Sequence, residues 1–293
     1  MHRSGFVNII GNPNVGKSTL MNALVGEKLS IITSKAQTTR HRIMGIVSGE
    51  DFQIVYSDTP GILKPSYKLQ ESMMKFVTGA LTDADVILYV TDTVEQSERS
   101  AEIVDSIRRS GIPTVVVINK IDLSTPEALE ALVDKWQAEI PGAQVVPTSA
   151  KENFNIEGLF RTILSLLPEG PAFYPKDTLT DKTLRFFASE IIREKILRNY
   201  DKEIPYSCEI EIEEYREESG IDRISAVIYV ARNSQKGILI GHKGEKLKKV
   251  GRQAREELEE FLRKKVFLQL FVKVSEDWRN DQRQLRRFGY DPQ

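Results

Sequence analysis

Residues 11–18, Gly-Asn-Pro-Asn-Val-Gly-Lys-Ser, constrain this chain more than any other stretch, because they fit the pattern G-x-x-x-x-G-K-[ST]. The two glycines let the backbone turn tightly, so that successive N–H groups can face a chain of phosphates. Lys17 places an ammonium beside the outer phosphates, and the Ser18 hydroxyl is a ligand for a Mg²⁺ ion that bridges two of them. An apolar strand at 6–10 leads in and a helical pattern at 20–25 leads out. The run therefore predicts a strand, a phosphate-binding loop and a helix whose positive end faces the anion.

Strand and helix patterns alternate through the first 170 residues. Apolar or alternating runs predict strands at 43–48, 52–57, 84–92, 113–118 and 144–147, and helical patterns lie at 69–81, 97–109, 126–138 and 156–166. Such alternation is typical of a doubly wound α/β sheet. Ligands of these sheets bind at the carboxyl ends of the strands, and the polar motifs of this chain follow such ends.

The first of these motifs is Asp58-Thr59-Pro60-Gly61, which follows the strand at 52–57. An aspartate at a strand end can serve as a second group at the metal site, after Ser18. The backbone N–H of the glycine can approach the terminal phosphate. Alone the motif is a weak signal, because ordinary turns use the same residue types. Its weight comes from its place after the phosphate-binding loop.

A second motif, Asn119-Lys120-x-Asp122, predicts which base is bound. Guanine presents N1–H and a 2-amino group side by side, and one carboxylate accepts both, whereas adenine would leave that carboxylate unpaired. We assign this contact to Asp122, with Asn119 tying loops together or reaching N7 and the Lys120 stem covering the ring. The segment Ser149-Ala150-Lys151 would offer a backbone N–H to the guanine O6.

A Pro-rich stretch at 168–175 separates this region from a second pattern of helix, two strands, two helices and a strand. The two later helices flank Gly241-His242-Lys243-Gly244. Glycines at both ends of such a loop let nucleotide phosphates approach the backbone, and an apolar groove beside it accepts single-stranded bases. A plain helix–turn–helix glycine pair is the alternative interpretation.

Charge and cysteine content narrow the classes of partner. The net charge is −1, yet residues 236–287 hold 15 Lys and Arg against 8 Asp and Glu. A polyanionic partner is therefore expected to bind the C-terminal part of the chain. The single cysteine, Cys208, excludes an internal disulfide and is expected to be an ordinary core or surface residue. No apolar run approaches the roughly 20 residues of a membrane span, and residues 1–10 show no signal-peptide pattern. A reducing cytosol is the expected compartment.

Taken together, these motifs and their order resemble the Era-like small GTPases, which join a P-loop GTPase domain to a smaller α+β type II KH domain. The stretch 36–42, Ala-Gln-Thr-Thr-Arg-His-Arg, is similar to the first switch loop of that family. The resemblance implies a GTPase domain at 1–168, a linker at 169–181, a KH domain at 182–276 and a C-terminal tail at 277–293. It also implies a cytoplasmic enzyme that hydrolyses GTP to GDP slowly, binds 16S rRNA near its 3′ end and assists maturation of the small ribosomal subunit. We expect a monomer and no DNA ligand.

The resemblance assigns roles to the matching positions. Lys17, Thr39 and Gly61 are the predicted catalytic residues, and Ser18, Thr39 and Asp58 the predicted Mg²⁺ ligands, with Thr38 as the alternative to Thr39. The predicted contacts to GTP or GDP are Gly11, Asn12, Pro13, Asn14, Val15, Gly16, Lys17, Ser18, Thr19, Asp58, Thr59, Pro60, Gly61, Ile62, Asn119, Lys120, Asp122, Ser149, Ala150 and Lys151. The predicted RNA contacts are Gly237, Ile238, Ile240, Gly241, His242, Lys243, Gly244 and Lys246.

Four residues leave alternatives open. Ile62 stands where Ras-like enzymes place a water-orienting Gln, so hydrolysis should be slow unless a partner or a monovalent cation completes the site. Asn14 matches a position that coordinates K⁺ in some relatives, and a plain loop residue is the alternative. Arg40 and Arg42 stabilise charge in catalysis or, as we favour, are solvated loop charges that later touch RNA.

Two other functions compete with RNA binding. A peripheral regulator of the inner membrane or of cell division would use the basic helix at 245–263 on anionic lipid. Its face also carries Glu256, Glu257, Glu259 and Glu260, which argues against lipid as the main ligand. A tRNA-modification GTPase would need an extra cofactor domain and a catalytic cysteine, for which Cys208 is a poor candidate.

Overall fold

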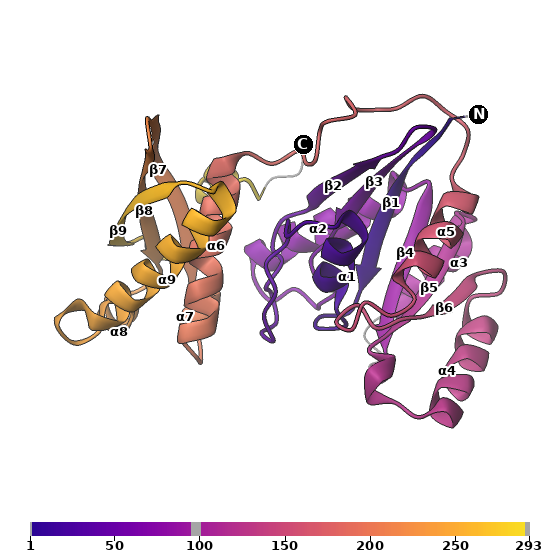
Figure 1. Cartoon of the computed structure of the whole chain (residues 1–293). Coiled ribbons are helices and arrows are strands. Elements are labelled where there is room, and N and C mark those ends of the chain that lie inside the picture. Colours follow the sequence, from indigo (N-terminus) through magenta and orange to yellow (C-terminus); the bar gives the residue numbers. More distant parts are fainter. Residues whose placement is uncertain (1, 95–100, 291–293) are drawn as a thin grey trace. The chain divides into compact units, whose positions relative to one another are not determined.

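The computed structural model describes residues 2–94 and 101–290 (Figure 1). The chain divides into two compact units, Met1–Ser66 with Gln70–Asp181, and Tyr67–Leu69 with Lys182–Gln293. Each unit is built around its own sheet and its own apolar core. The predicted fold class, a P-loop GTPase domain followed by a KH domain, is confirmed.

The first unit holds a six-stranded sheet in the order β2-β3-β1-β4-β5-β6. Its strands are β1 (Arg3–Gly11), β2 (Ile43–Ser48), β3 (Phe52–Asp58), β4 (Val86–Asp92), β5 (Thr114–Asn119) and β6 (Gln144–Pro147). β2 and β3 form the predicted antiparallel hairpin, and the other neighbours pair in parallel. β4 and β5 are buried along their whole length, as continuous apolar runs predict for central strands.

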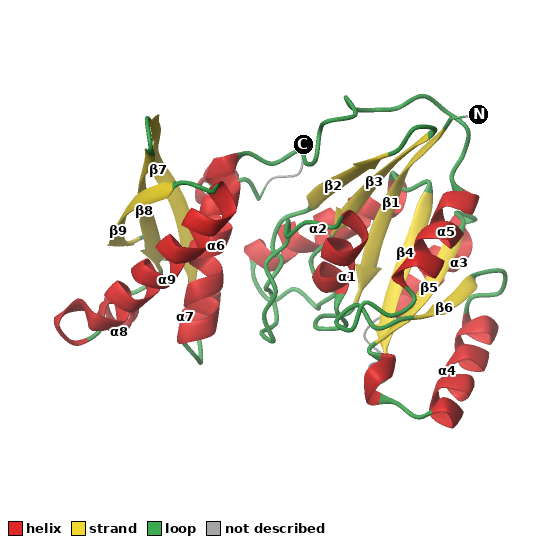
Figure 2. Ribbon diagram, in the orientation of Figure 1, coloured by secondary structure: helices red, strands yellow, loops and turns green. Residues whose placement is uncertain are grey.

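Helices cover both faces of this sheet (Figure 2). They are α1 (Lys17–Val25), α2 (Lys68–Thr82), α3 (Ala101–Ser110), α4 (Pro126–Glu139) and α5 (Ile156–Leu166), with a 3₁₀ turn, η2, at Ile121–Leu123. Val77 of α2, Val104 of α3 and Trp136 of α4 join one apolar core against β1, β4 and β5. The predicted helix at 97–109 begins in residues outside the described part of the chain.

The Pro-rich stretch predicted as a linker is hydrogen-bonded to the first unit. The Gln53 side chain accepts from the N–H groups of Phe173 and Tyr174 (2.7 and 2.9 Å) and donates to the Tyr174 carbonyl (2.8 Å). Further along, Ile46 N donates to Leu179 O (2.8 Å), and the Thr180 hydroxyl donates to Met44 O (2.6 Å). Residues 173 and 174 are therefore held to a side chain of β3, and residues 179–181 follow the outer edge of β2.

The second unit contains the predicted helices and strands in the predicted order, together with two short helices that the sequence did not predict. Its helices are α6 (Leu184–Asn199), α7 (Ile204–Ser207), α8 (Asn233–Ile240), α9 (Glu245–Leu262) and α10 (Gln282–Arg287), with a 3₁₀ turn, η3, at His242–Gly244. The strands β7 (Cys208–Glu218), β8 (Ile221–Val230) and β9 (Lys265–Val274) form one sheet with β8 in the centre, antiparallel to β7 and parallel to β9. Cys208 is buried in the core of this unit, as expected of a small apolar residue.

The described part of the predicted tail packs onto this sheet. Trp278, Leu285 and Tyr290 are all fully buried. Trp278 Nε1 donates to Ser207 O (3.0 Å), and the Tyr290 hydroxyl donates to the Glu209 carboxylate (2.6 Å). Three buried side chains thus anchor a segment whose other residues are mostly polar.

Among the described residues, no helix combines the length and the apolar character that a membrane crossing requires.

Candidate nucleotide site and RNA-binding loop

The loop from Gly11 to Ser18 has the backbone that its glycines permit. Gly16 begins α1 with a left-handed φ of 95°, and a Cβ there would lie 2.2 Å from Asn119 Nδ2. A Cβ on Gly11 would lie 2.1 Å from the carbonyl oxygen of Val90. Lys17 Nζ donates to the carbonyls of Gly11 (2.9 Å) and Asn12 (2.8 Å), so the ammonium lies inside the curve of the loop. The loop therefore surrounds its cation with carbonyls and presents N–H groups at the start of a helix, which suits a phosphate.

Three oxygen-bearing side chains meet beside this loop. Ser18 Oγ donates to Asp58 Oδ2 (2.7 Å) and lies 2.9 Å from Thr39 Oγ1, which is itself 3.4 Å from Asp58 Oδ2. Thr38 lies apart, because its hydroxyl is bound to Thr33 Oγ1 and to Lys35 O (both 2.6 Å). Of the two threonines left open by the sequence, the structure brings Thr39 to the metal candidates.

Asp58 is fully buried, and burial raises the pKa of its carboxyl, while the Ser18 hydroxyl and the Lys17 charge oppose that rise. Its Oδ1 has no hydrogen-bond partner among the described residues. A buried carboxylate with an unused oxygen, beside two hydroxyls and a phosphate-binding loop, fits Mg²⁺, which takes oxygen ligands and shares them with phosphates.

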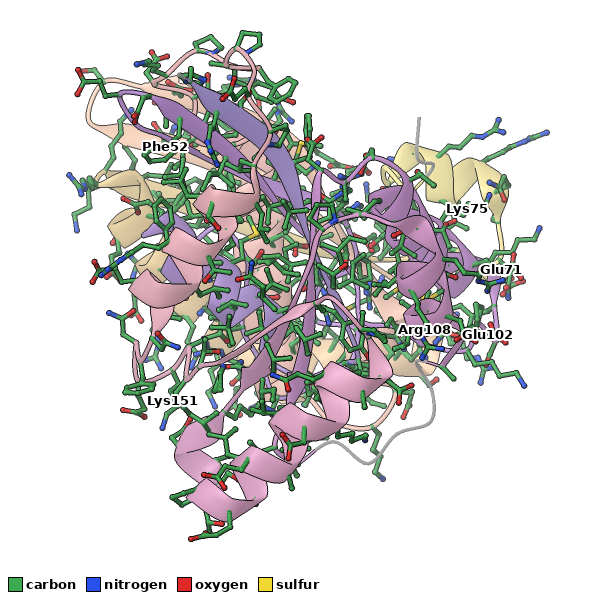
Figure 3. The ribbon with its side chains drawn as sticks, turned by 90° about the vertical axis from the view of Figure 1, so that its right-hand side faces the viewer. Phe52, Glu71, Lys75, Glu102, Arg108 and Lys151 are labelled. Carbon is green, nitrogen blue, oxygen red and sulfur yellow. The ribbon has the colours of Figure 1, made fainter. Side chains whose placement is uncertain are left out.

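Asn119 joins the base-recognition motif to the phosphate-binding loop. Its Nδ2 donates to Val15 O (2.9 Å), and its Oδ1 accepts from the Ala150 N–H (3.0 Å). Asp122, in η2, is exposed and accepts a hydrogen bond from Ser149 Oγ (2.6 Å). Three loops from distant parts of the chain are thereby fixed around one place, and Lys151, labelled in Figure 3, is exposed at its rim.

Lys120 connects the same loops by charge. It adopts a left-handed φ of 60°, and its Nζ donates to Asn14 O (2.5 Å) and to Asp92 Oδ2 (2.6 Å). Asp92 was missed by the sequence analysis, although it ends a buried strand just as Asp58 and Asn119 do. That shared position at a strand end was the available signal.

A cavity of about 370 Å³ lies between these groups and the segment 31–39. The segment has no recognisable motif before Lys35, and its contribution to the lining was missed except at Thr38 and Thr39. The lining residues from it are Ile31, Ile32, Thr33, Ser34, Lys35, Gln37, Thr38 and Thr39.

Gly61 and Ile62 follow Asp58 on the opposite side of the loop. A Cβ on Gly61 would lie 2.8 Å from Pro13 Cα, so only glycine fits this close approach. Ile62 is 5% exposed and packs in the apolar core with Ile10 and Tyr89. Its side chain has no polar atom with which to orient a water molecule.

The two switch-loop arginines are not solvated, contrary to the interpretation that the sequence favoured. Arg40 is fully buried, and the Arg42 side chain is 14% exposed and forms four hydrogen bonds. The sequence shows a polar stretch without periodicity here. Such a stretch predicts a loop, but it does not tell whether the side chains point inward or outward.

In the second unit, the glycine loop has three unusual backbone conformations. Gly241, Lys243 and Gly244 have φ values of 72°, 49° and 79°. His242, Lys243 and Lys246 lie at the surface, exposed or half-buried, as do Gly237, Ile238 and Ile240. Leu239, between Ile238 and Ile240, is fully buried in the core. The loop thus presents cations and an apolar side chain on one connection between two helices.

A groove of about 390 Å³ runs beside this loop between α9 and β9. Apolar Leu247, Leu268 and Leu270 line it together with cationic Lys248, Arg252 and Arg255, and Gly244 and Gly251 complete the lining. β9 lines the groove because it pairs with β8, and the sequence pattern did not predict that pairing. An apolar floor with a basic rim is the chemistry that single-stranded RNA requires.

Two family models match the chain. The model described as a 50S ribosome-binding GTPase matches residues 6–120, and the KH domain model matches residues 203–279. The curated GTPase Era of Staphylococcus haemolyticus (strain JCSC1435) is 43% identical over 291 residues, which cover 99% of this chain and 97% of that protein.

Solved structures agree along the full length. A crystal structure of Era in complex with MgGDPNP and nucleotides 1506–1542 of 16S ribosomal RNA matches with a TM-score of 0.95 at 41% identity, covering all of both chains. A single-substitution variant of Aquifex aeolicus Era bound to GDP·AlF4⁻ matches with the same TM-score and identity over 99% of this chain and 100% of that one. With the phosphate loop, the base-recognition loops and the KH unit all in place, this chain belongs to the Era family of GTPases.

Proposed function

We propose that this protein is a GTP-hydrolysing switch that binds 16S rRNA through its KH domain and assists maturation of the small ribosomal subunit. The observation that carries the proposal is Asn119, which ties the guanine-reading loops to the phosphate-binding loop. One site can then hold a guanine base and a triphosphate at a fixed separation.

Each group at the site has a role in this proposal. Lys17 binds the β- and γ-phosphates, while Ser18, Thr39 and Asp58 hold Mg²⁺, directly or through water. The ion, when bound, neutralises charge that develops on the phosphates during transfer. The Gly61 N–H meets the γ-phosphate, and Asp122 accepts the two donors of guanine.

Slow intrinsic hydrolysis follows from Ile62. Phosphoryl transfer to water is accelerated by a side chain that orients the water, and Ile62 is apolar and buried. We propose that a bound partner supplies the missing group or that a monovalent cation near Asn14 does so. Asn14 is an exposed residue of the phosphate-binding loop.

RNA is the proposed ligand of the second unit. The related Era structure contains nucleotides 1506–1542 of 16S rRNA, and the second unit of this chain carries the glycine loop and basic groove that suit a single strand. The site of action is then the cytoplasm, where ribosomal subunits mature. A peripheral contact with the inner face of the membrane is the second candidate, carried by the cations of α9, but that helix also holds exposed or half-buried glutamates.

Two measurements on the full chain test this function. We expect GTP to be hydrolysed and ATP not, and an RNA of the 3′ end of 16S rRNA to shift in a gel at protein concentrations that leave a scrambled RNA free. Flotation with vesicles of anionic lipid should recover little protein. Strong flotation with no preference between the two RNAs would favour the membrane candidate.

A further inference from the structure

Arg42 ends the loop that carries Thr39, and its guanidinium joins elements that are distant in the sequence. Nε donates to Ser57 Oγ (2.5 Å) at the end of β3. The two terminal nitrogens grip both oxygens of Asp83 (2.6 and 3.0 Å), and one of them also donates to Asn8 Oδ1 (3.2 Å). A bidentate pair of this kind fixes orientation as well as distance, because both groups are planar.

The partners of Arg42 are themselves fixed. Asn8 lies in the middle of β1, is fully buried, and uses Nδ2 to donate to Ala80 O and to Asp83 Oδ1 (both 2.7 Å). Ala80 lies in the last turn of α2, where carbonyls have no partner within the helix. A cation is also favoured at this end of a helix. Arg42 is thus bound to a framework made of β1, β3 and the end of α2.

Arg42 and one of its partners lie close to the metal candidates in the sequence. Ser57 directly precedes Asp58, and Arg42 follows Thr39 by three residues. The bond from Arg42 to Ser57 therefore lies beside the contact of Thr39 with Asp58. Because few residues separate Arg42 from Thr39, fixing the guanidinium restricts where the Thr39 hydroxyl can lie.

We infer that Arg42 is a positioning residue for GTP hydrolysis: it holds Thr39 at the Mg²⁺ site by fastening the switch loop to Ser57, Asn8 and Asp83. The inference rests on the proposed role of Thr39 at the metal. It also joins the two segments that approach the γ-phosphate, because α2 follows the turn at Asp58–Gly61 and ends beside Asp83.

The test compares Arg42→Ala with Arg108→Ala in the full chain. Arg108 of α3, labelled in Figure 3, serves as the control, because its guanidinium also forms hydrogen bonds within the same unit. Its Nε and one terminal nitrogen donate to the carbonyl of Glu139 at the end of α4 (3.0 and 2.7 Å). Single-turnover GTP hydrolysis is measured over a range of Mg²⁺ concentrations, together with GDP affinity. Removing a group that supports a metal ligand costs about 10–100-fold in metal affinity or activity. We expect Arg42→Ala to raise the Mg²⁺ concentration for half-maximal rate by that factor and to leave GDP affinity nearly unchanged.

Two further variants separate positioning from folding. Arg42→Lys keeps the charge but not the planar fork, so its Mg²⁺ requirement should fall between those of wild type and Arg42→Ala. Asp83→Asn keeps the shape and loses the charge at the far end of the fork, and its Mg²⁺ requirement should rise in the same direction. A wild-type Mg²⁺ curve in Arg42→Ala and in Asp83→Asn would overturn the inference.

Thr39→Ala makes failure of the inference distinguishable from failure of the proposed function. If Arg42 acts through Thr39, adding Arg42→Ala to Thr39→Ala should raise the Mg²⁺ requirement little further. Fully additive effects would show that Arg42 acts elsewhere and would overturn the inference alone. A wild-type Mg²⁺ curve in Thr39→Ala would remove the metal role of Thr39 and, with it, the basis of the inference.

Discussion

At the scale of single residues, the site depends on side chains whose surroundings decide their chemistry. Asp122 and Asp58 are both carboxylates at strand or turn ends, yet Asp122 is exposed and Asp58 is fully buried. The first is available to a ligand's hydrogen-bond donors. The second is available to a cation, because burial disfavours its charge until one is present.

Replacing Asp122 with Asn should change the base that is bound. The amide offers one acceptor and one donor, so one of the two guanine donors keeps its partner and the other faces a donor. GTP affinity should fall by roughly 2–4 kcal/mol, and xanthosine triphosphate should become the preferred ligand. Competition binding of the two nucleotides measures this, with Asp134→Asn on α4 as the control. Unchanged GTP affinity in Asp122→Asn would remove the assignment.

The buried Asp58 predicts that the stability of the ligand-free protein depends on pH. Its pKa is raised by burial, so the folded state binds this proton more tightly than the unfolded state does. The carboxylate therefore lowers the free energy of unfolding as pH rises above the ordinary Asp value of about 3.9. Without nucleotide and Mg²⁺, Asp58→Asn should melt at a higher temperature than wild type at pH 7, and the gap should close near pH 4. The same variant should lose Mg²⁺-dependent GTP binding. A lower melting temperature at pH 7 would contradict the assigned cause.

What the sequence revealed about the site depended on the spacing of residues. The motifs placed Lys17, Ser18, Asp58, Asn119 and Asp122 because fixed spacing reflects local backbone geometry. Thr38 and Thr39 could not be separated, since adjacent residues differ only in the direction of their side chains. Arg40 and Arg42 were misread for a related reason: an inward-facing cation needs partners from other strands, and those partners are visible only once the chain has folded.

At the scale of elements, periodicity placed the regular segments well and the irregular ones poorly. α4 and α5 begin and end within one residue of the predicted limits. α7 was missed, because a four-residue helix is too short to show a period. The packing of residues 277–290 was missed as well, since three buried side chains among many polar ones produce no pattern.

The glycine loop of the second unit makes a prediction at this scale. Lys243→Asp keeps both glycines, and so the turn, but places an anion where RNA phosphates should approach. RNA affinity should fall for every sequence tested, and the slope of log affinity against log salt should flatten by roughly 1 or more. Arg216→Asp, an equal charge change at an exposed residue of β7, is the control. Undiminished RNA binding by Lys243→Asp would place the RNA site elsewhere.

At the scale of the whole molecule, two ligands on two units allow one to influence the other. The γ-phosphate is read by the segments at Thr39 and Asp58, and order in such segments differs between GTP and GDP states of switch proteins. We expect RNA affinity of the full chain to differ between the GTP-analogue and GDP states. By linkage, RNA must then favour the nucleotide state that binds it more tightly. Gel shifts in both states and nucleotide titrations with and without RNA should give the same factor. Equal RNA affinity in both states would mean two independent modules on one chain.

The strip of chain along β2 has a consequence for self-association. An uncovered strand edge offers unpaired N–H and C=O groups to any other strand, including one from a second copy. Here Leu179 O takes the Ile46 N–H, and Thr180 and Asp181 satisfy the Met44 carbonyl and N–H. A GTPase fragment that stops at residue 168 would lose this cover, whereas one that extends to 181 would keep it. In light scattering, the shorter fragment should aggregate as its concentration rises, while the longer one should stay dispersed. The residues after the last GTPase helix would thus protect the edge of β2 from pairing with a second copy of the chain.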